Sequence, residues 1–89
     1  MPARHFTISG HVQGVFFRAQ TKEHADAIGL VGWVRNCEDG SVEVHAEGSS
    51  ELLAALEEWL HVGPPAAEIH DVASKQTELE NLKSFEIRY

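Results

Sequence analysis

The sequence predicts a single α+β domain in which an antiparallel sheet is covered on one face by two helices. Two patterns lead to this fold class. Segments in which hydrophobic and polar residues alternate are typical of half-buried strands, and two further segments repeat their less polar residues at helical spacing. With 89 residues, 43% of them hydrophobic and 24% charged, the chain has the size and composition of one globular domain spanning residues 1–89.

The first half of the chain is predicted to form a strand, a helix and a second strand. Residues 4–12 alternate, which indicates a half-buried strand. A helix is expected over residues 18–28, because less polar residues recur there at intervals of three or four, and Gly29 is a natural stop. Residues 31–37 are predicted as the second strand, and the Asp-Gly pair at residues 39–40 is a strong hairpin signal.

The third strand, residues 41–47, is predicted to have a buried face and an exposed face. Its alternation places Val42, Val44 and Ala46 inward and Ser41, Glu43, His45 and Glu47 outward. The second helix is expected to begin after residues 48–50, where a serine can cap it and Glu51 suits the positive end of its dipole. It should end at the Gly-Pro-Pro sequence of residues 63–65.

The end of the chain is predicted to add two strands. Residues 67–74 are expected to form the fourth strand, residues 75–83 a polar loop, and residues 85–89 a short closing strand. The order is therefore βαββαβ plus a terminal strand. With antiparallel pairing, this is the split βαβ or ferredoxin-like sandwich. That fold hosts many unrelated functions, so it does not identify an activity by itself.

The net charge of −7 is placed unevenly along the chain. Residues 1–40 contain four basic and four acidic side chains, whereas residues 41–89 contain three basic and ten acidic ones. An acidic protein repels nucleic acids and anionic membranes at long range, so neither is expected as a partner. An anion-binding site should lie in the neutral first half.

The composition also limits which cellular compartment and which cofactors are expected. The single cysteine, Cys37, permits no internal disulfide, and the chain shows no apolar signal region and no stretch of about 20 apolar residues. We therefore expect a cytoplasmic protein. None of the six histidines has the spacing of a zinc motif, and no Cys-x-x-Cys occurs, so no metal or other cofactor is expected.

The segment that joins the first strand to the first helix is the strongest candidate for a site. A loop that enters a helix N-terminus exposes backbone N–H groups without intrahelical partners, and the helix dipole adds partial positive charge there. Arg18 lies at this junction and can place two hydrogen bonds on one phosphate or carboxylate group. Spacing alone thus makes residues 13–18 a plausible anion site, but an ordinary surface arginine after a β–α turn remains the alternative.

Four segments of the chain resemble the acylphosphatase family. Residues 10–18 read GHVQGVFFR and residues 29–36 read GLVGWVRN, followed by Asp-Gly, and these resemble the two signatures of that family. The Gly-Pro-Pro of residues 63–65 and the closing FEIRY of residues 85–89 are also similar. His11 stands where family members often have a basic residue. A neutral histidine at this place would slightly weaken the attraction of anions.

The resemblance implies an activity and a role for each matching residue. The activity would be hydrolysis of the carboxyl–phosphate bond of a small acyl phosphate, giving a carboxylate and inorganic phosphate. Arg18 would hold the phosphate, and Asn36 would hold and orient the attacking water. The phosphate would also be bound by backbone N–H groups of Gln13, Gly14, Val15, Phe16, Phe17 and Arg18.

So few groups are chemically sufficient for this reaction. A carboxylate has a conjugate-acid pKa of about 4, so it leaves as a stable anion near neutral pH and needs no general acid. What remains is to hold the phosphoryl group, stabilise its charge and place a water in line. Asparagine is a poor base, so the water's proton is expected to pass to a substrate phosphate oxygen or to solvent.

The main alternative is a binding module of the same fold. An RNA-binding domain is disfavoured by the acidic charge and by the absence of an aromatic RNP pattern, and a metallochaperone by the lack of paired cysteines. A domain that binds carbamoyl phosphate or a similar ligand within a larger maturation protein is a further alternative. Because the chain ends at Tyr89, we expect a free-standing enzyme, and a monomer. The physiological acyl phosphate is not readable from the sequence.

Overall fold

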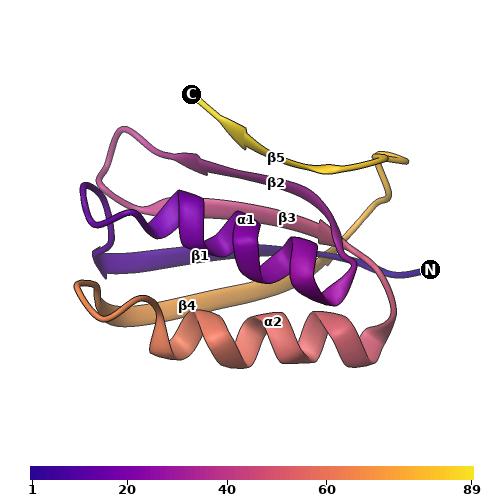
Figure 1. Ribbon diagram of the computed structural model, residues 1–89, viewed down its shortest axis with the longest axis horizontal. Coiled ribbons are helices and arrows are strands. Elements are labelled where there is room, and N and C mark those ends of the chain that lie inside the picture. Colours follow the sequence, from indigo (N-terminus) through magenta and orange to yellow (C-terminus); the bar gives the residue numbers. More distant parts are fainter.

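The helices and strands follow one another in the order that the sequence predicts. The computed structural model describes residues 1–89. Its elements are β1 (Ala3–His11), α1 (Phe17–Ile28), β2 (Val31–Asn36), β3 (Val42–Glu47), α2 (Ser50–Val62), β4 (Glu68–Thr77) and β5 (Phe85–Arg88), as Figure 1 shows. The βαββαβ order with a terminal strand is therefore confirmed, and with it the ferredoxin-like class.

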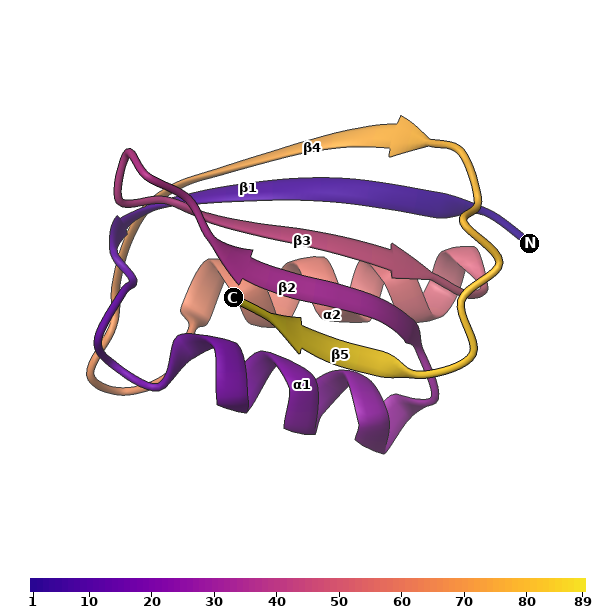
Figure 2. The same ribbon diagram turned by 90° about the horizontal axis from the view of Figure 1, so that it is seen from above.

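The five strands form one mixed sheet in the order β4-β1-β3-β2-β5. Neighbours among β4, β1, β3 and β2 are antiparallel, but β5 runs parallel to β2. The prediction of an antiparallel sheet is therefore wrong for β5. The connection over residues 78–84 runs across one end of the sheet, from the β4 edge to the β5 edge (Figure 2). Because β5 starts at the end where β4 stops, it runs opposite to β4 and along β2.

Both helices pack on the same face of the sheet, and the core lies between the two layers (Figures 1 and 2). The predicted inward side chains of β3, Val42, Val44 and Ala46, are fully buried there. The other large core side chains come from every layer: Phe6, Ile8, Val34 and Phe85 from strands, and Phe17, Leu53, Leu56 and Leu60 from helices. The period-two pattern of β3 thus identified the side chains that it contributes to the core.

The other face of β3 differs from the prediction. Ser41, His45 and Glu47 were expected to face outward into solvent, but all three are buried, and only Glu43 stays partly exposed. The ring of Trp33 stacks on His45, with centroids 5.8 Å apart. The connection over residues 78–84 covers Glu47, because backbone N–H groups of that connection donate to its carboxylate. A segment distant in sequence thus buries polar groups that alternation alone assigns to the surface.

One strand end deviates from the sequence pattern, and one helix cap agrees with it. β4 extends to Thr77, so residues 75–77, predicted as loop, pair with the start of β1. The cap of α2 agrees with the prediction, since the Ser49 hydroxyl accepts a hydrogen bond from the backbone N–H of Leu52 at 3.3 Å. Neither α1 nor α2 is long and apolar enough to cross a membrane.

Two glycines permit close approach of neighbouring strands. Gly32 has φ +154°, and a Cβ built on it would lie 1.9 Å from the carbonyl oxygen of His45. Gly10 has φ +128°, and its Cβ would lie 2.1 Å from the carbonyl oxygen of Glu68. The pairing of β1 with β4 shifts register at Gly10, so the chain bends there as it leaves the sheet for the candidate loop.

Candidate active site

The loop between β1 and α1 presents backbone N–H groups that no other backbone group uses. From Gly14 to Ala19, none of these N–H groups donates to a backbone carbonyl. Phe16 occupies the N-cap position in the left-handed region, with φ 62°, and its side chain makes no capping hydrogen bond. The first turn of α1 contains no acidic side chain. The positive end of the helix dipole is therefore available to an anion.

Arg18 lies in the first turn of α1 and reaches toward the end of β5. One guanidinium nitrogen, Nη1, donates to the carbonyl oxygen of Arg88 at 3.3 Å, and the guanidinium carbon lies 4.7 Å from the centre of the Tyr89 ring. This is the only hydrogen bond that Arg18 makes within the protein. Since a guanidinium has five N–H donors, the others remain free for an oxyanion.

Asn36 is the last residue of β2 and is exposed. It lines the same cavity as Arg18, with a volume of about 290 Å³. The cavity is also lined by Val12, Gly14, Phe16, Phe17, Ala19, Ile87 and Tyr89. We call it the Arg18 pocket. The two signatures, separate in sequence, therefore meet at one place in the structure.

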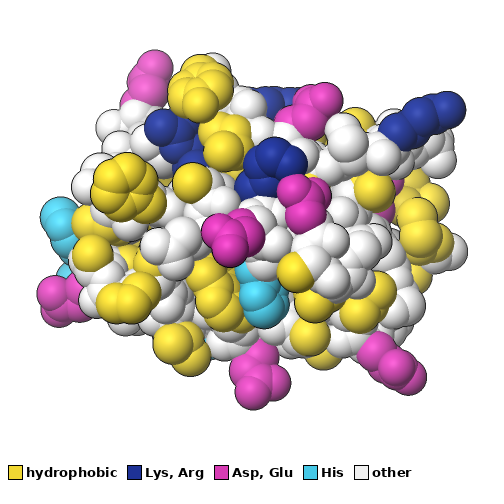
Figure 3. All heavy atoms as spheres, in the orientation of Figure 1, with side chains coloured by type: hydrophobic (Ala, Val, Ile, Leu, Met, Phe, Trp, Pro, Cys, Tyr) yellow, Lys and Arg dark blue, Asp and Glu magenta, His cyan; other side chains and the backbone are white.

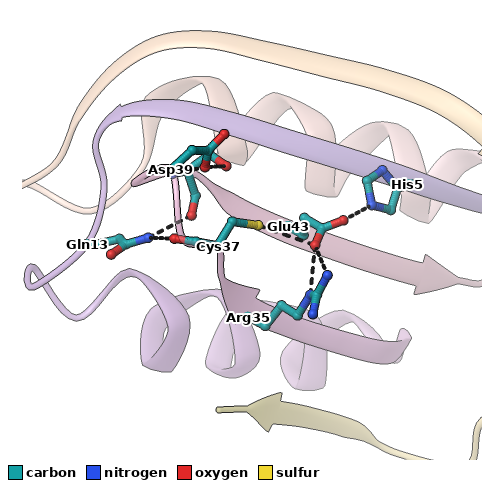
Figure 4. Close-up of polar contacts among 7 residues, drawn as sticks. His5, Gln13, Arg35, Cys37, Asp39 and Glu43 are labelled. Carbon is teal, nitrogen blue, oxygen red and sulfur yellow. Dashed lines mark hydrogen bonds and ion pairs between the residues drawn. The ribbon is translucent and has the colours of Figure 1, made fainter.

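The remaining predicted loop residues have different positions. Val15 is buried, with 7% of its surface exposed, and belongs to the core cluster. The Gln13 side chain points to the β2–β3 hairpin, where its amide Nε2 donates to the carbonyl oxygens of Cys37 and Ser41, both at 2.8 Å (Figure 4). Of these two residues, only the backbone N–H groups can face an anion in the loop. The sequence analysis did not predict these hydrogen bonds between the loop before α1 and the β2–β3 hairpin.

The hairpin that carries Asn36 is held by hydrogen bonds among its ionisable groups. Asp39 accepts from the Ser41 hydroxyl at 2.6 Å, which lowers the pKa of that carboxyl. Burial raises the pKa of Glu43, but hydrogen bonds from His5, Cys37 and Arg35 together outweigh it and hold the pKa below its ordinary value. Figure 4 shows these contacts converging on Glu43 from His5 on β1, Arg35 on β2 and Cys37 in the hairpin.

These ionisable groups lie outside the Arg18 pocket, whose lining contains no Asp, Glu, His or Cys. The pocket therefore offers hydrogen-bond donors and the positive charge of Arg18, and no Asp, Glu or His side chain to act as an acid or base. No group of three or more His, Cys, Asp or Glu residues could hold a metal ion in the structure. Such a site suits chemistry that stabilises charge without transferring a proton to the protein.

Sequence reasoning also missed Ile87 and Tyr89 as pocket residues. Both come from the closing segment of the chain, which the resemblance included without assigning a role. The only sequence feature that involved these two residues was the alternation of residues 85–89. The pairing of β5 beside β2, which places them next to Asn36, could not be read from that alternation.

The chain is similar in sequence and in fold to known proteins. A family model described as Acylphosphatase matches residues 4–87. An acylphosphatase of Nitrosococcus oceani is 48% identical over 81 residues, which make up 91% of this chain and 91% of that protein. The crystal structure of an acylphosphatase from Bacillus subtilis matches with a TM-score of 0.96 and 36% identity, covering 100% of both chains.

A larger protein contains a similar domain. The crystal structure of full-length HypF, in a phosphate- and nucleotide-bound form, matches with a TM-score of 0.88 and 26% identity. The match covers 99% of this chain but 12% of HypF.

Proposed function

The chain belongs to the acylphosphatase family, and on that premise we propose a mechanism for its hydrolysis of acyl phosphates. Arg18 and the backbone N–H groups of residues 13–18 hold the phosphoryl group, and Asn36 orients the attacking water. The observation that carries the proposal is the meeting of Arg18, Asn36 and the uncapped start of α1 in one pocket.

Charge stabilisation is the main contribution of the loop. The free guanidinium donors of Arg18 fork onto phosphate oxygens, while successive backbone N–H groups and the helix dipole act on the same group. These donors are fixed before substrate arrives, so they need no reorganisation as charge develops in the transition state.

Asn36 orients the attacking water. Its amide has both an acceptor and a donor, and no hydrogen bond inside the protein occupies them. The water oxygen bonds to phosphorus as the bond from phosphorus to the carboxyl oxygen breaks, and that electron pair leaves on the carboxylate. The water's proton passes to a phosphate oxygen or to solvent, consistent with a lining without Asp, Glu or His side chains.

The test is hydrolysis of acetyl phosphate in the presence of EDTA, with inorganic phosphate as a competitive inhibitor. Arg18→Ala should lose both phosphate binding and turnover, whereas Asn36→Ala should keep phosphate binding and lose most turnover. Arg4→Ala is a matched control, because Arg4 pairs with Ser74 away from the pocket. An Asn36→Ala enzyme with wild-type turnover would refute the role of Asn36.

A second candidate is binding of a phosphate compound without turnover. The match to a domain of HypF, whose crystal structure is of a phosphate- and nucleotide-bound form, motivates it. A wild-type protein that binds phosphate but does not hydrolyse acetyl phosphate would favour this candidate.

Monomeric state and a cytoplasmic location are part of the same proposal. The single cysteine supports a reducing compartment, since no disulfide stabilises the fold. Light scattering of the protein as it elutes from a size-exclusion column tests the monomeric state. Fractionation of cells, followed with an antibody to the native chain, tests the cytoplasmic location.

A further inference from the structure

The position of the Asn36 side chain in the Arg18 pocket is determined by the backbone alone. The side chain makes no hydrogen bond within the protein. Asn36 also stands at the end of β2, where its pairing with Val42 is the last of the β2–β3 ladder. A side chain that nothing holds directly follows the direction of its own Cα–Cβ bond. The orientation of the attacking water therefore depends on what fixes the residues on either side of Asn36.

The two chain neighbours of Asn36 donate to the same oxygen atom. Nε of Arg35 lies 2.7 Å from Oε1 of Glu43, and Sγ of Cys37 lies 3.3 Å from the same Oε1. Glu43 stands directly opposite Arg35 in the ladder of β2 with β3. One carboxylate oxygen thus bridges residues 35 and 37, as Figure 4 shows, and Asn36 is the residue between them.

Glu43 is itself held in place by a third donor. Its other oxygen, Oε2, lies 2.8 Å from Nε2 of His5 on β1, and only 19% of the Glu43 side chain is exposed. An ionised carboxylate only accepts hydrogen bonds and has room for about four, so all three donors fit on it. Because β3 lies between β1 and β2 in the sheet, Glu43 connects the end of β2 to the centre of the sheet.

Glu43 lies on the opposite side of the sheet from the pocket. Val42 and Val44 are buried under the helices, so Glu43 between them projects from the other face. Figure 4 shows that face, with the helices behind the sheet. Figure 3 shows the helix-covered face, where hydrophobic side chains gather around a basic one at the upper left, near the C-terminus. Glu43 does not line the pocket, so any effect of Glu43 on turnover passes through the backbone of β2.

We propose that Glu43 is a positioning residue for Asn36: by holding Arg35 and Cys37, it fixes the segment that directs the Asn36 amide at the attacking water. The inference rests on the proposed role of Asn36 and adds to it a residue outside the two segments that resemble the family signatures. It implies a loss of turnover without a loss of phosphate affinity when Glu43 is changed, because the loop before α1 keeps its own contacts.

The first test is Glu43→Val, which removes all three hydrogen bonds and places a residue that suits a strand. The kcat for acetyl phosphate should fall by about tenfold or more, because small displacements of a reacting group have effects of this size. The inhibition constant of inorganic phosphate should change by less than about twofold. Calorimetry with phosphate counts the folded sites, and kcat is expressed per site. An unchanged kcat, or an inhibition constant that rises as much as kcat falls, would overturn the proposal.

The second test is rescue by the conservative variant Glu43→Gln. The amide oxygen of glutamine still accepts from Arg35 and Cys37, and its NH₂ group donates to His5 in the other tautomer. Glu43→Gln should therefore keep kcat within about threefold of the wild type. If Glu43→Gln is as slow as Glu43→Val, the bridging of residues 35 and 37 is not what matters, and the proposal is wrong.

Glu47→Gln controls for a loss of stability alone. Glu47 lies four residues further along β3 and is also paired with a histidine, His45, at 2.8 Å. It makes no hydrogen bond to Arg35 or Cys37. Its kcat per folded site should stay within about twofold of the wild type. Equal losses of kcat in Glu47→Gln and Glu43→Val would show that Glu43 acts only through stability.

Failure of this inference and failure of the proposed function give different results. If the wild type and Glu43→Val hydrolyse acetyl phosphate equally well, only the inference about Glu43 is wrong. If the wild type hydrolyses none, ¹⁵N relaxation decides whether Glu43 fixes Asn36. The backbone order parameter of Asn36 should be about 0.85 in the wild type and below about 0.6 in Glu43→Val, with that of Gly14 unchanged. An order parameter of Asn36 that is equal in both proteins would overturn the inference.

Discussion

The side-chain amide of Gln13 donates to the carbonyl oxygen of Ser41 at 2.8 Å, which joins the loop before α1 to the hairpin after β2. The same Nε2 donates to the carbonyl oxygen of Cys37 at 2.8 Å, one residue beyond Asn36. Each of the two halves of the candidate site is therefore fixed relative to the other through one side chain. Gln13 is a positioning residue in this arrangement, because its side chain does not line the pocket.

We expect Gln13→Ala to lower kcat for acetyl phosphate by about tenfold to 100-fold, because small displacements of reacting groups have effects of this size. Inhibition by inorganic phosphate should weaken less, since Arg18 and the helix dipole remain. Steady-state kinetics with phosphate as inhibitor measures both. Ser74→Ala removes two hydrogen bonds from Arg4 far from the pocket and serves as control. Equal kinetic losses in the two variants would show that Gln13 acts only through general stability.

Cys37 is expected to react slowly with thiol reagents. Burial raises the pKa of the Cys37 thiol, and the neighbouring carboxylate of Glu43 raises it further, although a hydrogen bond with Ser41 lowers it. The thiolate is the reactive form, so its fraction at pH 8 is below that of an ordinary cysteine. The rate of reaction with a disulfide reagent, followed against pH, should rise only above the usual thiol range. Glu43→Gln should make the reaction faster, and a slower reaction in that variant would contradict this explanation.

Gly32→Ala should destabilise the fold by about 3 kcal/mol or more, because the new Cβ would lie 1.9 Å from the carbonyl oxygen of His45. Neither the backbone of Gly32 nor the carbonyl group of His45 can move away without breaking the pairing of β2 with β3. Gly29→Ala is the control: Gly29 also has positive φ, at +84°, but nothing lies within 4 Å of its Cβ position. We expect about 1 kcal/mol there, from the left-handed conformation alone. Urea denaturation measures both, and similar losses would refute the close-approach argument.

Local patterns predicted those parts of the fold that depend on local physics. Alternation identified the side chains that β3 contributes to the core. The serine before α2 caps that helix, and the glycine loop before α1 leads into an uncapped helix start. The placement of Arg18 and Asn36 in one pocket agrees with what the family resemblance implied, but spacing alone did not yield it.

The features that the sequence did not predict all depend on contacts between distant segments. His45 and Glu47 have the pattern of exposed residues, yet Trp33 and the connection over residues 78–84 bury them. The direction of β5 follows from the path of that same connection around the end of the sheet. Ile87 and Tyr89 reach the pocket only because β5 pairs with β2.

Glu47 makes several of these contacts between distant segments. Its carboxylate accepts hydrogen bonds from the ring of His45 at 2.8 Å and from the backbone N–H groups of Glu80 and Leu82. The His45 ring is also 3.8 Å from the carboxylate of Glu80, whose other oxygen accepts from the Trp33 indole at 3.2 Å. Glu47 thereby fastens the connection over residues 78–84, and with it β5, to β3.

Glu47→Gln should therefore destabilise the protein by about 2–4 kcal/mol at pH 7, since a buried charged acceptor of several hydrogen bonds is replaced by an amide. Burial raises the pKa of Glu47, but hydrogen bonds from His45, Glu80 and Leu82 together outweigh it and hold the pKa below its ordinary value. A lowered carboxyl pKa gives stability that is present above the unfolded value and is lost as pH falls through the folded value.

Urea denaturation at pH 7, 5, 4 and 3 tests this expectation. The wild type should lose stability steeply below about pH 4.5, and Glu47→Gln should lose less over that range because it has one carboxylate fewer to protonate. Some loss should remain, since the pKa of Glu43 is also lowered. Glu86→Gln is the control, because Glu86 is exposed and should change stability by no more than about 0.5 kcal/mol at any pH. Parallel pH profiles for wild type and Glu47→Gln would mean that the contacts of Glu47 do not hold the end of the sheet together.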